Sequence, residues 1–266
     1  MKLSVFYANI KDAVRENQGT LAEVLAAAKN AGIEYLDLDF TDIKNGLPEE
    51  IKNSGLGINS IYAFFDFREK DAVSEAKRAA DFAADCGACI MPVHKTLPDS
   101  ELQALKAAKS ETEVFSFLDG FEPALKTAAA LEEIALYAES KGTFACVENF
   151  DSAGSFTERK NELKWLFNKA PHLKFNLDTG NSVTCGENIK ELFSLFSGKT
   201  VNIHCKDRIF TNGKYKCCPV GSGLMPIKEI KDKITRDSYT GGFSIEVFGV
   251  KNPLEAITLS AEYLLK

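Results

Sequence analysis

The sequence predicts an α/β fold, a single (β/α)8 TIM barrel that takes up residues 1–266. Strand-like and helix-like segments alternate from one end of the chain to the other, and about eight strand–helix pairs follow one another. The length of 266 residues also suits a barrel of this kind, which typically needs about 250. Because no Pro/Gly/Ser-rich linker, composition break or low-complexity stretch divides the chain, we expect one domain.

The first half of the chain alternates apolar, β-rich runs with alanine-rich or amphipathic stretches. Gly32 provides a stop for the first helix, and Pro48 suits the first turn of the second. A long insert follows the fourth strand and predicts one short and one long helix. The predicted strands are 3–8, 33–40, 57–65 and 88–93, the predicted helices are 20–31, 47–54 and 70–86, and the insert is 98–141.

The second half repeats the pattern with shorter connections. Pro226 is expected to open the seventh helix, and the segment NPLEAITLSAEYLLK is expected to close the chain as an amphipathic helix. The remaining predicted elements are strands at 143–148, 173–178, 200–205 and 242–248, with helices at 157–169 and 187–197.

Each strand of the second half carries one residue, at or near its end, that apolar packing does not require. In a (β/α)8 barrel the C-terminal ends of all strands open onto one face, where active sites are built. Three carboxylates and one imidazole converging there would form a site for one divalent metal ion. These ligand types favour Mn²⁺, Mg²⁺ or Co²⁺, and the order of metal affinities also admits Zn²⁺. The four residues are Glu148, Asp178, His204 and Glu246.

Each of the four also has a simpler explanation. Glu148 could be an exposed carboxylate at a strand end, Asp178 could start a turn before Gly180, and His204 could be a hydrogen-bonded core residue. Glu246 is harder to explain in this way, because it follows a strand that is buried on both faces, where an unpaired charge is costly. The fourfold recurrence of the pattern favours the metal site.

The segments CVEN, LDTGN, HCKDR and SIEV resemble those of the sugar isomerase/epimerase superfamily with a xylose-isomerase-like barrel. This family includes ketose 3-epimerases, hydroxypyruvate isomerases, and inosose dehydratases and isomerases. The resemblance implies that Glu148, Asp178, His204 and Glu246 bind one divalent metal, and that Glu148 and Glu246 act as catalytic acid and base. It also implies an isomerase or epimerase of a small sugar, keto-sugar or polyol, which reacts through an enediolate next to a metal-bound carbonyl.

The chain departs from the family pattern at two places. Asn181 stands where the family often carries a substrate-binding histidine, and an amide cannot carry a proton at neutral pH. The second strand offers Asp37 and Asp39 where the family commonly has a glutamate.

Further residues near the strand ends are candidates for contact with a polar substrate. Gly221 and Gly223 could leave backbone amides free for a phosphate, or could form a flexible lid. The expected substrate-binding residues are His94, Asn181, Asp207 and Arg208.

Composition narrows the classes of partner. The net charge of -6, with 32 basic residues scattered among 38 acidic ones, argues against nucleic acid. We expect no membrane span and no signal peptide, and the seven cysteines, an odd number without a regular framework, favour reduced thiols in the cytoplasm. The expected partner is a small sugar or polyol, and a homo-oligomeric state is left open.

Three other functions stay open at this point. A keto-polyol dehydratase would use the same proton abstraction, followed by loss of a β-hydroxyl group. A metal-dependent abasic-site endonuclease would normally need a His-rich zinc cluster, whereas this chain has three histidines. A non-catalytic sugar-binding barrel would not need four metal-type residues at its strand ends.

Overall fold

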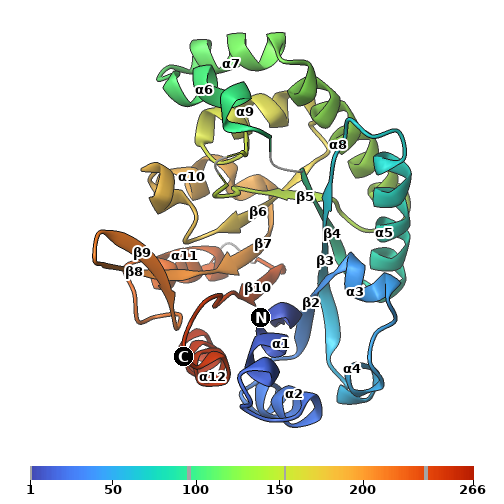
Figure 1. Ribbon diagram of the computed structural model, residues 1–266, viewed down its shortest axis with the longest axis vertical. Coiled ribbons are helices and arrows are strands. Elements are labelled where there is room, and N and C mark those ends of the chain that lie inside the picture. Colours follow the sequence, from blue (N-terminus) through green and yellow to red (C-terminus); the bar gives the residue numbers. More distant parts are fainter. Residues whose placement is uncertain (1, 95–96, 153, 237–238) are drawn as a thin grey trace.

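The computed structural model describes residues 2–94, 97–152, 154–236 and 239–266 and confirms the predicted barrel (Figure 1). Its eight parallel strands follow the order β4-β3-β2-β1-β10-β7-β6-β5, and a bridge between Ile90 and Ala145 brings the two ends of this sheet together. The barrel is therefore nearly closed. Its strands are β1 (Lys2–Phe6), β2 (Tyr35–Asp39), β3 (Gly57–Phe65), β4 (Cys89–His94), β5 (Cys146–Glu148), β6 (Lys174–Asp178), β7 (Thr200–Cys205) and β10 (Gly242–Ile245).

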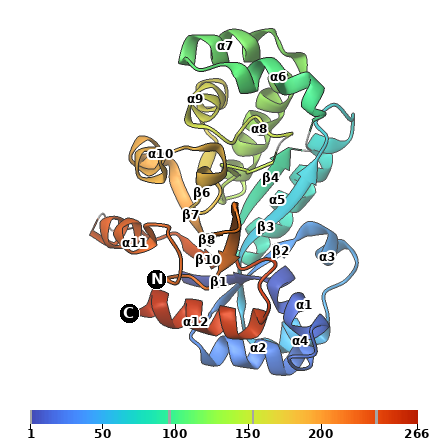
Figure 2. The same ribbon diagram turned by 60° about the vertical axis from the view of Figure 1, so that its left-hand side comes forward.

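Helices surround the barrel on its outside (Figure 2). Among the described residues, no helix is long and apolar enough to cross a membrane. The α-helices are α1 (Tyr7–Arg15), α2 (Leu21–Asn30), α3 (Phe40–Lys44), α4 (Glu49–Ser54), α5 (Ala72–Cys86), α6 (Asp99–Ala107), α7 (Glu111–Gly120), α8 (Glu122–Ser140), α9 (Lys160–Lys169), α10 (Ile189–Phe196), α11 (Ile227–Arg236) and α12 (Pro253–Leu265), and the 3-10 helices are η1 (Ser182–Cys185) and η2 (Ser197–Lys199).

Helix α10 shows why these segments become helices. Its buried residues are spaced three and four apart, so they form one apolar face, and the side chain of Asn188 caps the first turn by accepting from the backbone N–H of Lys190 at 3.0 Å. The buried face consists of Ile189, Leu192, Phe193 and Phe196. Such faces pack against the strands and form the main hydrophobic core between the sheet and the helices.

The interior of the barrel contains a polar layer below the strand ends. Asp37 lies fully buried in it and accepts hydrogen bonds from Ser4 at 2.6 Å, Asn59 at 2.8 Å and Ser60 at 2.5 Å. Asp39 instead caps helix α3 by accepting from the backbone N–H of Thr41 at 2.7 Å. The two acidic residues of the second strand therefore make structural hydrogen bonds, Asp37 inside the barrel and Asp39 at the start of α3.

A β-hairpin after β7 is missing from the predicted elements. Strands β8 (Asp207–Thr211) and β9 (Lys214–Cys218) pair antiparallel and stand out from the rim of the barrel (Figure 1). Asn212 and Gly213 connect them with positive φ values of 50° and 72°, which is the backbone of a tight hairpin turn.

Other predicted elements also differ from the structure: the strand expected at 143–148 begins at Cys146, the strand expected at 242–248 ends at Ile245, and α1 and α3 are missing from the prediction. The first strand ends at Phe6 and not at residue 8, because Tyr7 already begins helix α1. The insert contains three helices and not two, because Ser110 starts a new helix by forming a capping box with Glu113.

Candidate metal centre

Four neighbouring strands each bring one metal-type side chain to the C-terminal end of the barrel. Glu148 and Asp178 are the last residues of β5 and β6, His204 lies in β7, and Glu246 directly follows β10. One ligand atom from each lies within 4.8 Å of the other three. All four are at most 7% exposed. The structure thus places together the four residues that the sequence predicted as ligands, and we call them the ligand cluster.

The distances inside the ligand cluster suit a cation. His204 Nδ1 lies 3.1 Å from Glu148 Oε1 and 3.5 Å from the nearest oxygen of Glu246. Asp178 Oδ2 is completely buried and accepts no hydrogen bond from the described residues, and the ammonium group of Lys206 lies 3.2 Å from it. A buried carboxylate oxygen is costly unless cations or hydrogen bonds compensate its charge. The donor set of three carboxylates and one imidazole therefore fits one divalent metal ion.

Burial and mutual contact shift the acid–base behaviour of the ligand cluster. Burial raises the pKa of Glu246 to about 8 and also raises the pKa of Glu148. Burial disfavours the protonated form of His204 and so lowers its pKa. The neighbouring Glu148 carboxylate favours that form more strongly, and the pKa of His204 is raised to about 9. Burial likewise acts against the charge of Asp178, yet Lys206 and His204 hold the pKa of Asp178 below its usual value.

Asp178 is held in place by its own loop and by a neighbouring strand. Its Oδ1 accepts from the backbone N–H groups of Gly180 and Asn181, both at 2.8 Å. The side chain of Asn149, the residue after Glu148, makes two hydrogen bonds to the backbone of Asp178. It accepts from the N–H at 2.8 Å and donates to the carbonyl at 2.9 Å. Asn149 was not predicted as a site residue, because this role depends on how β5 and β6 are aligned.

Asn181, predicted to bind substrate, lies against the ligand cluster. Its Nδ2 donates to Glu148 Oε1 at 3.2 Å, and its Oδ1 accepts from Lys206 Nζ at 2.8 Å and from Arg208 at 3.3 Å. Two cations thus hold the amide oxygen, which directs the NH₂ group towards Glu148. Lys206 and Arg208 both need a hydrogen-bond acceptor at position 181. A protonated histidine there would have no acceptor, and the two cations would repel it.

Lys206, which is not among the predicted site residues, also reaches the ligand cluster. Its Nζ lies 2.5 Å from Glu246 Oε1 and 3.2 Å from Asp178 Oδ2. Burial opposes the charge of Lys206, but these carboxylates outweigh it and hold its pKa well above the usual range. A signal was present, since Lys206 follows His204 by two residues and continues the same face of an extended chain.

Arg208 and His94 are not members of the ligand cluster: Arg208 lies next to it through Asn181, and His94 lies at the C-terminal end of β4. Arg208 donates to Asp151 Oδ2 at 2.5 Å, and its buried Nε has no hydrogen-bond partner among the described residues. His94 ends β4, lies 3.1 Å from Ser155 Oγ and stacks on Phe156 with ring centroids 4.2 Å apart. Substrate contact by Arg208 and His94 remains a proposal.

We expect that replacing Arg208 or His94 with alanine impairs substrate binding and leaves metal binding intact. The kcat/KM should fall by roughly 10- to 100-fold, the cost of one lost hydrogen bond to a charged group, with metal content near that of the wild type. Steady-state kinetics and elemental analysis of the same preparations measure both quantities, and Arg78→Ala, in an exposed pair with Glu75, is the control. Loss of the metal from Arg208→Ala would show that Arg208 supports the ligand cluster.

Asp207 has a different environment from the one expected of a substrate ligand. It is 1% exposed, and its two carboxylate oxygens accept from the backbone N–H groups of Gly221, Gly223 and Met225 at 2.9 to 3.0 Å. It also accepts from the N–H of Arg208 at 2.9 Å. We therefore assign Asp207 to holding the loop before α11 and not to binding substrate.

Aromatic rings border the ligand cluster on the side of β1 and β3. The ring of Phe6 lies edge-on to His204, with centroids 4.8 Å apart, and also contacts Tyr62 at 5.3 Å and Phe248 at 5.7 Å. These rings form an apolar wall beside the buried charges. Such a wall suits the carbon face of a sugar or polyol.

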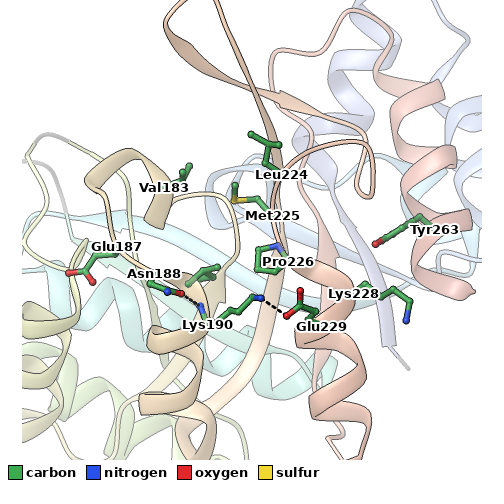
Figure 3. A pocket seen from close by; sticks show the side chains of 11 residues that line it. Val183, Glu187, Asn188, Lys190, Leu224, Met225, Pro226, Lys228, Glu229 and Tyr263 are labelled. Carbon is green, nitrogen blue, oxygen red and sulfur yellow. Dashed lines mark hydrogen bonds and ion pairs between the residues drawn. The ribbon is translucent and has the colours of Figure 1, made fainter.

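A separate pocket lies on the outside of the barrel, between the segment around α10 and the start of α11 (Figure 3). Val183 and Leu224 line it, and Lys190 and Glu229 form an ion pair across it. No residue of the ligand cluster lines this pocket. The candidate metal centre is therefore a distinct site.

The comparison with known proteins identifies the family. Residues 25–266 match the sequence model of the xylose isomerase-like TIM barrel family. The chain belongs to this family. No curated protein matches the chain in sequence.

Solved structures of this barrel type resemble the whole chain. The probable 3-DHS dehydratase of Bacillus anthracis has a TM-score of 0.71 and 16% identity, with 100% of this chain and 99% of that chain covered. The 3-keto-D-glucoside 4-epimerase of E. coli has a TM-score of 0.67 and 15% identity, with coverages of 100% and 99%. A xylose isomerase-like TIM barrel protein of Mycobacterium smegmatis in complex with magnesium has a TM-score of 0.67 and 18% identity, with coverages of 92% and 86%. At these identities the likeness shows the fold alone.

Proposed function

We propose that this protein is a divalent-metal-dependent isomerase or epimerase of a small sugar, keto-sugar or polyol. The observation that carries the proposal is the convergence of Glu148, Asp178, His204 and Glu246 within 4.8 Å at the C-terminal end of the barrel. These residues would hold one Mn²⁺, Mg²⁺ or Co²⁺ ion, and Zn²⁺ is also compatible with the donor set. The family and the magnesium complex of the Mycobacterium smegmatis relative support this reading.

The two glutamates are suited to moving protons. A divalent ion would stabilise the negative charge that develops when a carbon beside a carbonyl loses its proton. Glu148 and Glu246 come from β5 and β10, which β6 and β7 separate, so their carboxylates reach the cluster from different sides. Burial raises the pKa of both groups, for Glu246 to about 8, and a raised pKa suits a carboxyl group to proton transfer. One glutamate would remove the proton, and the other would return it on the opposite face.

The loop after β7 favours a substrate without a phosphate group. In many barrels this region binds phosphate through free backbone amides. Here the N–H groups of Gly221, Gly223 and Met225 are bound to Asp207, and that of Leu224 donates to the carbonyl of Arg208 at 2.9 Å. The N–H groups of Gly221 and Gly223, which could have bound a phosphate, are therefore already engaged in hydrogen bonds within the protein.

A keto-polyol dehydratase is the second candidate. The similarity to the probable 3-DHS dehydratase, which covers the whole chain, favours it. The same glutamate would remove the proton, and the other would protonate a departing β-hydroxyl group. A His-rich multi-zinc nuclease is disfavoured, because His204 alone among the three histidines belongs to the ligand cluster, while His94 stacks on Phe156 and His172 pairs with Glu132.

Metal analysis followed by a substrate screen tests the proposal. We expect about one divalent ion per chain, and deuterium from the solvent should enter the carbon beside the carbonyl of the correct ketose or inosose. Net conversion would then distinguish an epimer or isomer from an unsaturated elimination product. Absence of a bound divalent metal, or exchange that continues unchanged after EDTA treatment, would contradict the proposal.

A further inference from the structure

Lys206 brings a positive charge into the ligand cluster itself. It directly follows β7, its side chain is 8% exposed, and its Nζ contacts Glu246 Oε1 at 2.5 Å and Asp178 Oδ2 at 3.2 Å. A buried ammonium group is costly unless carboxylates pair with it, and here two ligands of the proposed metal do so. The ammonium group and a divalent cation therefore draw on the same two carboxylates.

The loop after β6 positions the side chain of Lys206 in the ligand cluster. Thr179 Oγ1 accepts from the N–H of Lys206 at 3.0 Å and donates to its carbonyl at 2.8 Å. A Cβ atom at Gly180 would lie 2.7 Å from Lys206 Cγ, so only glycine leaves room for the side chain to pass. Asn181 then receives the ammonium group at 2.8 Å. Three consecutive residues after Asp178 thus position this lysine.

The charges explain what such a lysine can do. The ligand cluster holds three carboxylates, and a buried set of like charges destabilises the fold unless cations compensate them. Lys206 compensates them permanently, because it is part of the chain. The same positive charge opposes a divalent ion a few ångströms away.

We propose that Lys206 is the resident counter-cation of the metal centre: it stabilises the ligand cluster without metal and weakens the binding of the divalent ion. The lysine therefore lowers the affinity for the metal, and in return it keeps the ligand cluster folded and preformed when no metal is bound. The inference concerns metal binding and does not depend on which reaction the protein catalyses.

The test removes the charge and measures metal binding directly. Lys206→Met keeps the length and apolar stem of the side chain, and Lys206→Gln also keeps an amide that can donate hydrogen bonds. Calorimetric titration of EDTA-treated protein with MnCl₂ should show a dissociation constant lower by on the order of tenfold for both variants, because a nearby unit charge no longer opposes the ion. Their melting temperatures in EDTA should fall below that of the wild type, and saturating Mn²⁺ should restore them.

An exposed lysine provides the control. Lys228→Met removes a charge from an exposed pair with Asp232 on α11 and should leave the dissociation constant for Mn²⁺ unchanged within about twofold. Unchanged or weaker Mn²⁺ binding by the Lys206 variants would overturn the proposal, as would an unchanged melting temperature in EDTA. If neither variant folds without metal, recovery of the fold in Mn²⁺ supports the counter-cation role, and failure to recover refutes it.

Discussion

Replacing Glu148 or Glu246 with glutamine should lower turnover by at least about 10²-fold while the protein keeps its metal. Glutamine retains an oxygen that can contact the ion, but it cannot accept or release a proton at neutral pH. Both side chains are at most 7% exposed, and the glutamine variants preserve their volume, so the surrounding packing should survive. Steady-state kinetics on the correct substrate and elemental analysis measure the two quantities.

The two variants also distinguish the candidate reactions. An epimerase needs a proton-transfer group on each face of the substrate, so one variant could still exchange a substrate proton with solvent while failing to epimerise. A dehydratase would depend on one glutamate more than on the other. The control is Glu229→Gln on α11, which removes a carboxylate outside the ligand cluster. If both variants hold the metal and remain fully active, the two-carboxylate mechanism is wrong.

The barrel and the convergence of the four strand-end residues could be predicted from the sequence. A parallel barrel requires alternating strands and helices, and it brings the C-terminal ends of the strands to one face, so strand order alone determines which side chains meet. The expectation that Glu148 and Glu246 approach from different sides follows from the two strands that lie between β5 and β10. Metal occupancy and the catalytic roles remain predictions.

Other features depend also on contacts between segments that lie apart in the sequence. Lys206 reaches the carboxylates only because Gly180, on a different strand end, leaves room for it. Asp207 has the residue type of a substrate ligand, and only the folded loop shows that backbone amides surround its carboxylate. The hairpin is a different case: the Asn-Gly pair at its turn is a strong local signal that was available in the sequence.

Replacing Asp178 with asparagine should weaken binding of the divalent metal by on the order of 10²-fold and reduce activity to background. The two oxygens of Asp178 have separate tasks: Oδ1 is held by the backbone amides of Gly180 and Asn181, and Oδ2 faces the ligand cluster, 3.2 Å from Lys206 Nζ. An asparagine at this position removes the negative charge. Its single NH₂ group must face either Lys206 or the backbone N–H groups of the loop, and in both orientations one contact between two donors becomes repulsive.

The same substitution should also lower stability without metal. Lys206 would lose one of its two carboxylate partners and keep Glu246, so we expect a loss of about 1–3 kcal/mol in the free energy of unfolding. Titration with Mn²⁺ and chemical denaturation in EDTA measure the two effects, with Asp232→Asn on the exposed face of α11 as the control. Metal content equal to that of the wild type would remove Asp178 from the ligand set. Weakened metal binding with unchanged stability would instead show that Asp178 binds the metal but does not anchor Lys206.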